Sequence, residues 1–385
     1  MNKRGSTTWS IFTRMKHSMA IACINYARAC WKKGMWSAYP HNGWATWPRR
    51  ALELKNYTIG MMALYFAVKL RKKGYYTRRS LKCYLFAWQH LRSTPALIRY
   101  VEFRRDMGML LTKRLAQLLQ KGLGNLNDYD YYLALSFLLE RTPELIMPAC
   151  FSQNANGLLT PPLAASLPEK SAKMALISEI HQQQAQWREA FGNWVKQQQS
   201  AGICVVGNAA SLTGKNMGHK FDQFGAVIRF NLFQTDDDTY ADIGTHHDAW
   251  VMAPGFRGYA PQKVKWCIIT GPDMRFRLSY WDTVLPLLHD NIPVLTVPLP
   301  VWRDIVAKLK SPPSAGIVFL AFLRELLGSW EGVHIAGIGT GLTLGGRYHR
   351  ADSKQHAVTR HDWHKEARLI RKWQQEGLSI LDDAS

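Results

Sequence analysis

Histidines toward the C-terminal end of the chain are the residues best suited to acid–base chemistry. His349 is followed by His361 and, three positions later, by His364. Imidazole titrates near neutral pH, so such a side chain can act as a general base or, when protonated, bind a phosphate. The spacing differs from that of an H-E-x-x-H zinc helix. A cluster of solvent-exposed histidines without a function is the simpler alternative.

A second candidate is an anion site at residues 311–316, where Pro, Ser, Ala and Gly precede the strongly apolar segment 317–327. Ser314 stands where the N-cap of a helix is expected. Free N–H groups and the helix dipole attract anions at such a start. The alternative is that Ser314 only caps a core helix, which is the more common case.

A third candidate follows the apolar run 203–207, which predicts a buried strand that leads into small residues. In an open parallel sheet, ligands bind outside the carboxyl ends of the strands. Gly207 would let the backbone approach a ligand, and Asn208 offers both a donor and an acceptor. An ordinary strand-to-helix turn is the alternative. The segment has neither a G-x-G-x-x-G fingerprint nor a P-loop lysine, which disfavours dinucleotide and P-loop sites.

Metal-binding patterns are weak in this chain. The triplet Asp236-Asp237-Asp238 resembles a D-x-D metal clip, but no predicted strand leads directly into it, so we expect a solvated acidic turn. The six cysteines are far apart and show no Cys/His metal spacing, which favours free thiols in a reducing compartment. We therefore predict no metal site.

The elements that must position these residues form an α/β domain over residues 200–385. This region contains six short apolar runs, and such runs are typical of strands buried in a parallel sheet. Because helical stretches separate several of them, we expect a mostly parallel sheet flanked by helices. Residues 151–199 precede this domain and are predicted to form a linker and a polar helix. The runs are 203–207, 227–230, 249–252, 266–269, 294–297 and 333–337.

Residues 1–150 are predicted to form a separate, basic α-helical domain. They contain 25 Lys and Arg against 7 Asp and Glu, whereas residues 151–385 contain 24 against 21. Such a cationic surface attracts an anionic membrane, an acidic glycolipid or nucleic acid. The apolar stretch 57–70 is too short to span a membrane and predicts a buried or surface-lying helix. The expected helix breaks are at 73–74, 93–95, 122–124 and 142–143, and the expected lipid contacts are the basic clusters 71–73, 78–79 and 104–105.

Taken together, four motifs in a fixed order resemble those of glycosyltransferase family 29, the sialyltransferases. No single motif is specific, but the ordered set within residues 203–366 is. The first motif is Ile203-Cys204-Val205-Val206-Gly207-Asn208-Ala209-Ala210-Ser211-Leu212, which continues through 220–222 and 226–231 to Asp242-Ile243-Gly244-Thr245. The others are Pro313-Ser314-Ala315-Gly316 with a strand that ends in Gly337-Ile338-Gly339, then Tyr348-His349, then His361 with Glu366.

This resemblance implies a sialyltransferase-like variant of the GT-A fold, a CMP-activated sugar acid as donor, and an inverting displacement that needs no metal or other cofactor. It implies His361 as the base and His349 as a phosphate contact. Glu366 would be an orienting partner or a structural cap, and Tyr348 would support the site. The implied donor-binding residues are Gly207, Asn208, Ser211, Asn231, Ser314, Ala315 and Gly316.

The chain also departs from the family pattern. Ser211 replaces the second Asn of the long motif, and Ala315 replaces a Thr, which removes one hydroxyl donor from the implied donor site. Secreted animal members join the long and short motifs by a disulfide. Here Cys204 is displaced by one position, and no cysteine lies between Pro313 and Gly339, so that bridge cannot form. These features suggest a cytoplasmic bacterial relative.

The function that the sequence predicts is the transfer of sialic acid, or a related 2-keto sugar acid, to a cell-surface glycan such as lipopolysaccharide or capsule. The enzyme would be cytoplasmic and held at the inner membrane by its basic half. A CMP-Kdo-dependent transferase remains an alternative, because its donor also carries CMP and a carboxylate. A nucleic-acid-binding protein with a Trp-rich basic half and a catalytically inactive glycan binder stay open as well.

Overall fold

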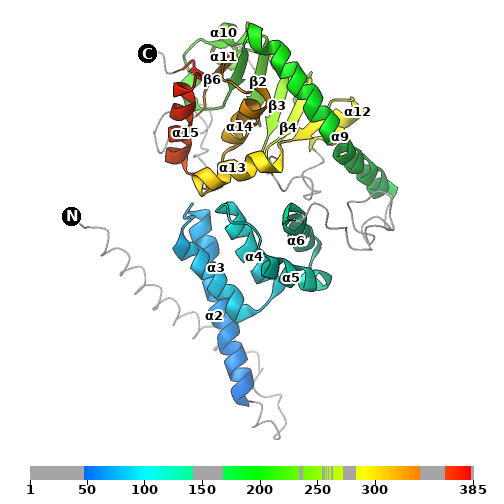
Figure 1. The fold of residues 1–385 in the computed structure, drawn as a ribbon, viewed down its shortest axis with the longest axis vertical. Helices are drawn as coiled ribbons and strands as arrows, with labels where there is room; N and C mark the ends of the chain where they lie inside the picture. The colour runs from blue at the N-terminus through cyan, green and yellow to red at the C-terminus, as the bar shows by residue number, and fades with distance from the viewer. Residues whose placement is uncertain are drawn as a thin grey trace, which may run out of the picture. The chain divides into compact units, whose positions relative to one another are not determined.

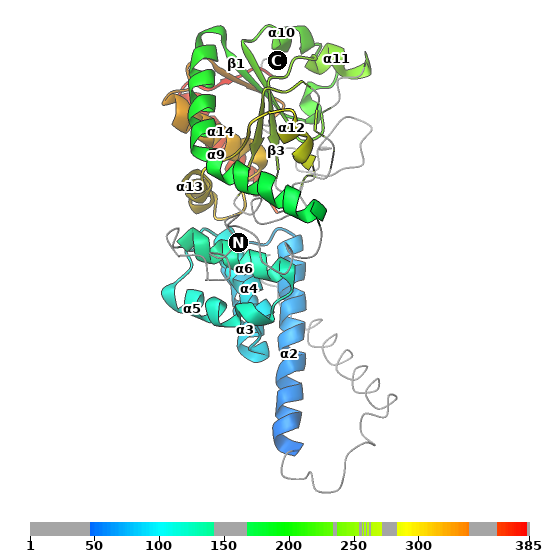
Figure 2. The same cartoon turned by 90° about the vertical axis from the view of Figure 1, so that its right-hand side faces the viewer.

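The computed structural model describes residues 47–141, 168–233, 237–253, 263–271, 283–338 and 360–382, together with 256, 258, 260 and 261 (Figures 1 and 2). The chain folds into two compact units. Of the described residues, 47–71 and 77–100 belong to the first unit, and 72–76 and 101–382 belong to the second. Residues 151–167 of the linker predicted at 151–168 lie outside the described residues, as do residues 1–46. Pro168, the last residue of that predicted linker, is instead the first residue of a helix, α9 (Pro168–Gln198).

Helices make up the described part of the first unit. They are α2 (Trp47–Lys72), α3 (Arg78–Leu91) and the start of α4 (Thr94–Asp106). The Thr77 side chain caps α3 by accepting a hydrogen bond from the N–H of Ser80. The predicted breaks at 73–74 and 93–95 are confirmed. The predicted helix at 57–70 is confirmed within α2, where several large apolar side chains are exposed: Leu54, Tyr57, Met61 and Tyr65.

Three helical segments follow α4 in the second unit: α5 (Lys113–Gly122), the 3-10 turn η1 (Leu123–Asn125) and α6 (Asp128–Arg141). The leucine spacing predicts that Leu111 and Leu115 share one helix, and this is wrong. Thr112 accepts a hydrogen bond from the Leu115 N–H and thereby starts α5 after Leu111. The expectation that Arg105 contacts lipid is also wrong, because its side chain is buried against Phe137.

A seven-stranded, all-parallel sheet forms the core of the second unit, with the strand order β5-β4-β3-β2-β1-β6-β7. The six predicted strands are confirmed. The sequence did not reveal β7, because two residues are too short to show a hydrophobic pattern. The strands are β1 (Ile203–Val206), β2 (Ala226–Phe230), β3 (Ala249–Met252), β4 (Trp266–Ile269), β5 (Val294–Thr296), β6 (Val333–Ala336) and β7 (Ser379–Ile380).

Helices cover both faces of this sheet, which explains why the strands are apolar on both sides (Figure 2). Ile203 and Val205 of β1 face the core formed with α9, α13, α14 and α15. Cys204 and Val206 face the opposite core, which α10 closes through Phe221. The covering elements are α9 (Pro168–Gln198), η2 (Gln199–Ala201), η3 (Ala210–Leu212), α10 (Gly218–Asp222), α11 (Asp237–Ile243), α12 (Leu285–His289), α13 (Leu299–Leu309), α14 (Ala315–Leu327) and α15 (Trp363–Gln375).

Two further predictions concern this region. The polar helix expected before the sheet is confirmed as α9. The acidic triplet is not wholly a turn, because α11 begins at Asp237, and Asp236 lies outside the described residues. The prediction of a turn is therefore wrong for Asp237 and Asp238, which are part of the helix α11.

The central strands β1 and β6 approach closely just beyond their paired residues. The Gly207 N–H donates to the Ala336 carbonyl at 2.7 Å, and the Ala209 N–H donates to the Gly337 carbonyl at 3.0 Å. A Cβ atom on Gly207 would lie 2.2 Å from the Gly337 oxygen. The absence of a side chain at Gly207 is therefore required by the neighbouring backbone, whether or not a ligand also approaches it.

We predict that Gly207→Ala lowers the free energy of unfolding by about 2 kcal/mol, because the added methyl group meets backbone atoms that cannot move aside. Denaturant unfolding measures this. Gly124→Ala is the matched control, since a Cβ there meets nothing within 4 Å, and we expect a change within about 1 kcal/mol. Equal effects of the two substitutions would show that the close approach of β1 and β6 does not constrain Gly207.

Candidate active site

The candidate site lies at the carboxyl edge of the sheet, where the predicted residues of the long and short motifs meet. Asn208 follows β1, Asn231 follows β2, and Gly337 follows β6. The helix α14 leads into β6, which is parallel to the other strands, so the start of α14 lies at this same edge (Figure 1). Ligands bind at this edge in open α/β sheets.

The two asparagines join neighbouring strand ends. The Asn208 side-chain amide donates to the carbonyls of Phe230 at 2.9 Å and Leu232 at 3.2 Å. Asn231 adopts φ 46°, a left-handed conformation that asparagine tolerates, and its side-chain oxygen accepts from the Ala253 N–H at 2.9 Å. In the described part of the chain, no hydrogen bond uses Oδ1 of Asn208 or Nδ2 of Asn231. These two atoms remain able to bind a polar ligand.

Ser211, another predicted donor-binding residue, is engaged with the C-terminal segment. Its hydroxyl donates to Oδ2 of Asp382 at 2.8 Å, and the same oxygen accepts from the Gly337 N–H at 3.0 Å. Ser211 thus ties the turn after β1 to the segment after β7 and to the end of β6. This contact stabilises the sheet edge around Gly337.

The turn that begins α14 is clamped by a buried carboxylate. Ser314 is the N-cap, and its hydroxyl accepts from the Ile317 N–H. Glu366, which is 2% exposed, accepts from the Ser314 N–H at 2.8 Å and from the Ser314 hydroxyl at 2.6 Å. Burial raises the pKa of Glu366 to about 7, and the two hydrogen bonds from Ser314 oppose that shift. Glu366 therefore supports the start of α14 directly.

His361 is bound to the same turn. Its Nδ1 lies 2.9 Å from the Pro312 carbonyl oxygen, which can only accept, so Nδ1 carries a proton, and in the neutral ring the lone pair is on Nε2. Burial and, to a smaller extent, the charge of Arg360 lower the pKa of His361, while the bond to Pro312 opposes the shift. The half-buried imidazole is accordingly neutral at pH 7. Its ring also packs edge-on against Trp363.

The beginning of α15 holds His361 in place. Asp362 caps this helix by accepting from the Lys365 N–H. The Lys365 ammonium donates to the Leu309 carbonyl at 2.6 Å and pairs with the Asp362 carboxylate at 2.9 Å. His361, which directly precedes the N-cap Asp362, is thereby fixed relative to the end of α13. The imidazole itself contacts the Pro312 carbonyl and the Trp363 ring.

Charged residues of the long motif serve as loop anchors. Arg229 is 1% exposed and donates to the carbonyls of Ile243 at 2.6 Å and His246 at 2.9 Å. Asp222 accepts from the N–H groups of Thr245 and His246. Burial lowers the pKa of Arg229 to about 10, and the charge of Asp222 opposes this shift. The sequence alone does not reveal these roles, because the bonded pairs are separated by 14 to 24 residues along the chain.

The structure thus brings together Asn208 and Asn231 at the strand ends, and Ser314, His361 and Glu366 at the start of α14. Ala315 and Gly316 form the first turn of that helix. The predicted Tyr348 and His349 lie outside the described residues. In the described ranges, no group of three or more His, Cys, Asp or Glu side chains could hold a metal ion.

The clamp on Ser314 gives a pH-dependent prediction. Because the folded pKa of Glu366, about 7, lies above its ordinary 4.5, the folded state binds more protons than the unfolded state between these values, and stability falls as pH rises through them. Glu366→Gln keeps an acceptor and a donor but does not titrate. The free energy of unfolding of the wild type, relative to this variant, should therefore fall from about pH 4.5 to 7 and then level.

Denaturant unfolding over this pH range measures the difference. Glu366→Ala should cost about 3 kcal/mol near pH 4.5, because the N–H and hydroxyl of Ser314 lose a buried acceptor. This cost should shrink as pH rises toward 7, because the wild type loses stability there and the variant does not titrate. A difference between wild type and Glu366→Gln that does not change with pH would contradict the raised pKa.

The comparison with family models agrees with the motif pattern. A family model described as glycosyltransferase family 29 (sialyltransferase) matches residues 158–281. No curated protein matches the chain. Among solved structures, a mammalian sialyltransferase is 20% identical over 48% of this chain and 70% of its own, with a TM-score of 0.37. A mammalian sialyltransferase in complex with Gal-beta-1-3GalNAc-ortho-nitrophenol is 18% identical over 47% of this chain and 68% of its own, with a TM-score of 0.34.

The matched residues contain the whole long motif, from Ile203 to Thr245. They end before Ser314, His361 and Glu366, so for these residues the resemblance to the family rests on motif order alone. The similarity to glycosyltransferase family 29, the sialyltransferases, that the motifs predicted is therefore confirmed over residues 158–281 of this chain.

Proposed function

We propose that this chain is an inverting glycosyltransferase that moves sialic acid, or a related 2-keto sugar acid, from a CMP-sugar to a hydroxyl of a glycan acceptor. The family match supports a sialyltransferase-like glycosyltransferase. The observation that carries the proposal is the bond from His361 Nδ1 to the Pro312 carbonyl. It leaves a neutral imidazole with a free lone pair beside the start of α14.

The donor would bind at the carboxyl edge of the sheet. The free side-chain atoms of Asn208 and Asn231 would bind the nucleotide, and the first turn of α14 would receive the phosphate or the sugar carboxylate. CMP leaves as a phosphate monoester, so negative charge grows on the leaving group, and the N–H groups and dipole of a helix start stabilise such charge. Gly316 leaves space there, and Ala315 offers no hydroxyl. His349 would bind the phosphate, supported by Tyr348.

His361 would be the general base. Its Nε2 removes the proton from the acceptor hydroxyl as that oxygen attacks the anomeric carbon of the sugar acid. The bond from this carbon to the CMP phosphate breaks on the opposite side, so configuration is inverted. His361 would take up the proton of the acceptor hydroxyl, and the start of α14 would stabilise the negative charge on the leaving phosphate. The proposed transfer therefore uses no divalent ion.

A donor screen tests this function. The purified full-length chain is mixed with CMP-Neu5Ac or with CMP-Kdo, with and without an acceptor glycolipid, and released CMP is measured. We expect release that rises with acceptor for one of the two donors. Both donors carry CMP and a 2-keto acid carboxylate, so the screen also decides between them. CMP release from neither donor with any acceptor would contradict the proposal.

The base assignment gives a sharper prediction. His361→Ala should lower turnover by about 10²–10⁴-fold, because loss of a general base acts on the transition state. Binding of CMP, measured by calorimetry, should change little. His364→Ala is the matched control, because His364 is exposed on α15, and it should keep wild-type turnover. Near-normal turnover in His361→Ala would remove the assignment.

We also propose that the basic N-terminal half docks the enzyme on an anionic membrane surface, at the cytoplasmic face of the inner membrane, where it would meet lipopolysaccharide or capsule precursors. In the described residues, no helix is both long and apolar enough to cross a bilayer. The exposed apolar side chains of α2, from Leu54 to Tyr65, suit a helix that lies on a lipid surface. Exposed basic residues follow it closely: Lys72, Lys73, Arg78 and Arg79.

Sedimentation with liposomes of varied anionic lipid content checks this docking. Binding should rise with anionic lipid and weaken with added salt. Replacing the four basic residues just named by Gln should weaken binding strongly, since each contributes about 1 kcal/mol near the surface. The control replaces four exposed basic residues outside the basic N-terminal half: Lys196, Lys215, Lys220 and Arg371. Equal losses in the two variants would contradict docking through these residues.

A further inference from the structure

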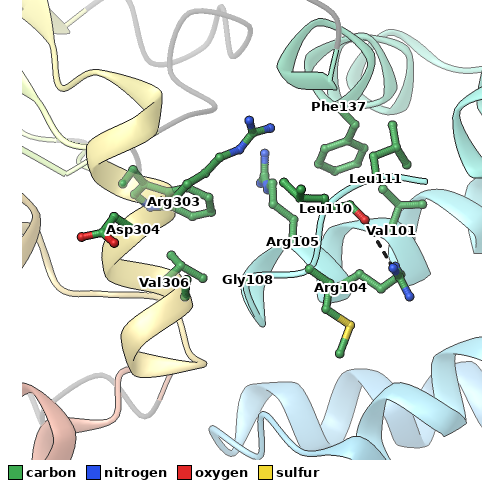
Figure 3. A pocket seen from close by; sticks show the side chains of 13 residues that line it. Val101, Arg104, Arg105, Gly108, Leu110, Leu111, Phe137, Arg303, Asp304 and Val306 are labelled. Atoms are coloured by element: carbon green, nitrogen blue, oxygen red, sulfur yellow. Dashed lines mark hydrogen bonds between the residues drawn. The ribbon is translucent and has the colours of Figure 1, made fainter. Parts of the chain in front are cut away.

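A pocket of about 340 Å³ lies beside α13, and the arginines that line it interact with other groups of the protein (Figure 3). Arg104 donates to the Leu110 carbonyl at 3.3 Å, and the Arg105 guanidinium lies 4.6 Å from the ring centre of Phe137. Arg303 likewise has a partner within the protein. Because these charges are engaged, the pocket gives no basis for a charged ligand.

The turn after β2 differs, because in the described part of the chain Nδ2 of Asn231 has no partner. The other hydrogen-bonding atoms of Asn231 are bound by β3 and by the residue that follows this strand. The Asn231 N–H donates to the Val251 carbonyl at 2.9 Å, and its side-chain oxygen accepts from the Ala253 N–H at 2.9 Å. Its carbonyl accepts from the indole N–H of Trp250 at 2.8 Å. Asn231 is thus held on every side except the one that could meet a ligand.

Three successive carbonyls of this turn accept hydrogen bonds from side chains. The Asn208 amide binds the carbonyls of Phe230 and Leu232, and the Trp250 indole binds the carbonyl of Asn231 between them. One donor follows β1 and the other belongs to β3. The turn is therefore clamped from both neighbouring strands of the sheet.

The backbone of Asn231 needs such a clamp. Its φ of 46° lies in the left-handed region, which costs a non-glycine residue free energy and persists only where surrounding contacts hold it. The indole bond acts on the carbonyl of this same residue. Loss of the bond would allow the turn to relax and the side-chain amide to leave its present position.

Trp250 is suited to this task because its ring is fixed by the core. It is fully buried and packs with Met252, Val264 and Cys267, and its ring meets that of Phe256 edge-on at 5.6 Å. An indole N–H can only donate, and a buried one usually finds an acceptor. The donor that holds the turn is therefore rigid.

We propose that Trp250 is a positioning residue for the donor site: its indole holds Asn231 in the left-handed conformation that keeps Nδ2 available to the nucleotide. Trp250 itself would not touch the donor and would act through Asn231. This inference rests on the proposed function, which assigns Asn231 to the nucleotide.

The chain offers a matched control at Trp330. This side chain is 1% exposed and packs on Trp373 at 5.2 Å, as a core residue does. Its indole N–H is buried and has no hydrogen-bond partner among the residues that the structure describes. Trp250→Phe and Trp330→Phe therefore remove the same atoms from two buried sites, and only the first breaks a hydrogen bond.

NMR without any ligand tests the hold on Asn231. Full-length protein carries ¹⁵N-labelled asparagine, and the side-chain amide signal of Asn231 is assigned by its loss in Asn231→Gly. We expect an ordered amide in the wild type and in Trp330→Phe. In Trp250→Phe the order parameter should fall toward the values below about 0.6 that mark a flexible group.

Calorimetry with CMP tests the consequence for the donor site. Trp250→Phe should weaken CMP binding by about tenfold, the effect of losing one hydrogen bond, and Trp330→Phe should bind CMP as the wild type does. Asn231→Gly keeps a residue that tolerates the left-handed conformation and removes the amide, so it should weaken binding by about tenfold as well. Adding Trp250→Phe to Asn231→Gly should then weaken binding less than about twofold further, because the indole acts through the missing amide.

Three results would overturn the proposal. The first is an order parameter of the Asn231 amide that Trp250→Phe leaves unchanged or that both tryptophan variants lower equally. The second is equal CMP affinity of the two tryptophan variants. The third is a loss from Trp250→Phe that is as large in the Asn231→Gly background as in the wild type. A wild type that binds no CMP would contradict the proposed donor site instead, and the order parameter would still report whether Trp250 holds Asn231.

Discussion

The candidate site depends on one short turn, Pro312–Ser314, to which two side chains bind. One is Glu366 of α15, and the other is His361, which directly precedes the N-cap of that helix. His361 bonds to the Pro312 carbonyl, and Glu366 bonds to both the N–H and the hydroxyl of Ser314. The same contacts orient an imidazole and fix the start of α14. The proposed base and the start of α14 are therefore held by hydrogen bonds to the same short turn.

The sheet supplies the second constraint. Because all its strands are parallel, their carboxyl ends and the start of α14 meet at one edge. The close approach of Gly207 to Gly337 brings β1 and β6 together there, while Asn208 and Asn231 tie β1, β2 and β3 at the same edge. The charged residues of the long motif hold the surrounding loops. Most of this motif thus builds the edge at which a donor would bind.

Much of the fold could be predicted because its signals are local. Mostly apolar runs predicted the six longer strands, and Ser314 before an apolar segment predicted the start of α14. The partners of the site residues could not be predicted, because they are far apart in the chain: Ser314 and Glu366 by 52 residues, Ser211 and Asp382 by 171. Leu111 was misplaced because leucine spacing alone does not show where Thr112 caps a helix.

The tautomer of His361 is the most direct test of the account. Full-length protein labelled with ¹⁵N-histidine would be studied by two-dimensional NMR at pH 7, with the His361 signals assigned by their loss in His361→Gln. The bond to the Pro312 carbonyl predicts a neutral ring with the proton on Nδ1 and an unprotonated Nε2. A ring protonated on Nε2 at pH 7, whether as the other neutral tautomer or as an imidazolium, would contradict it.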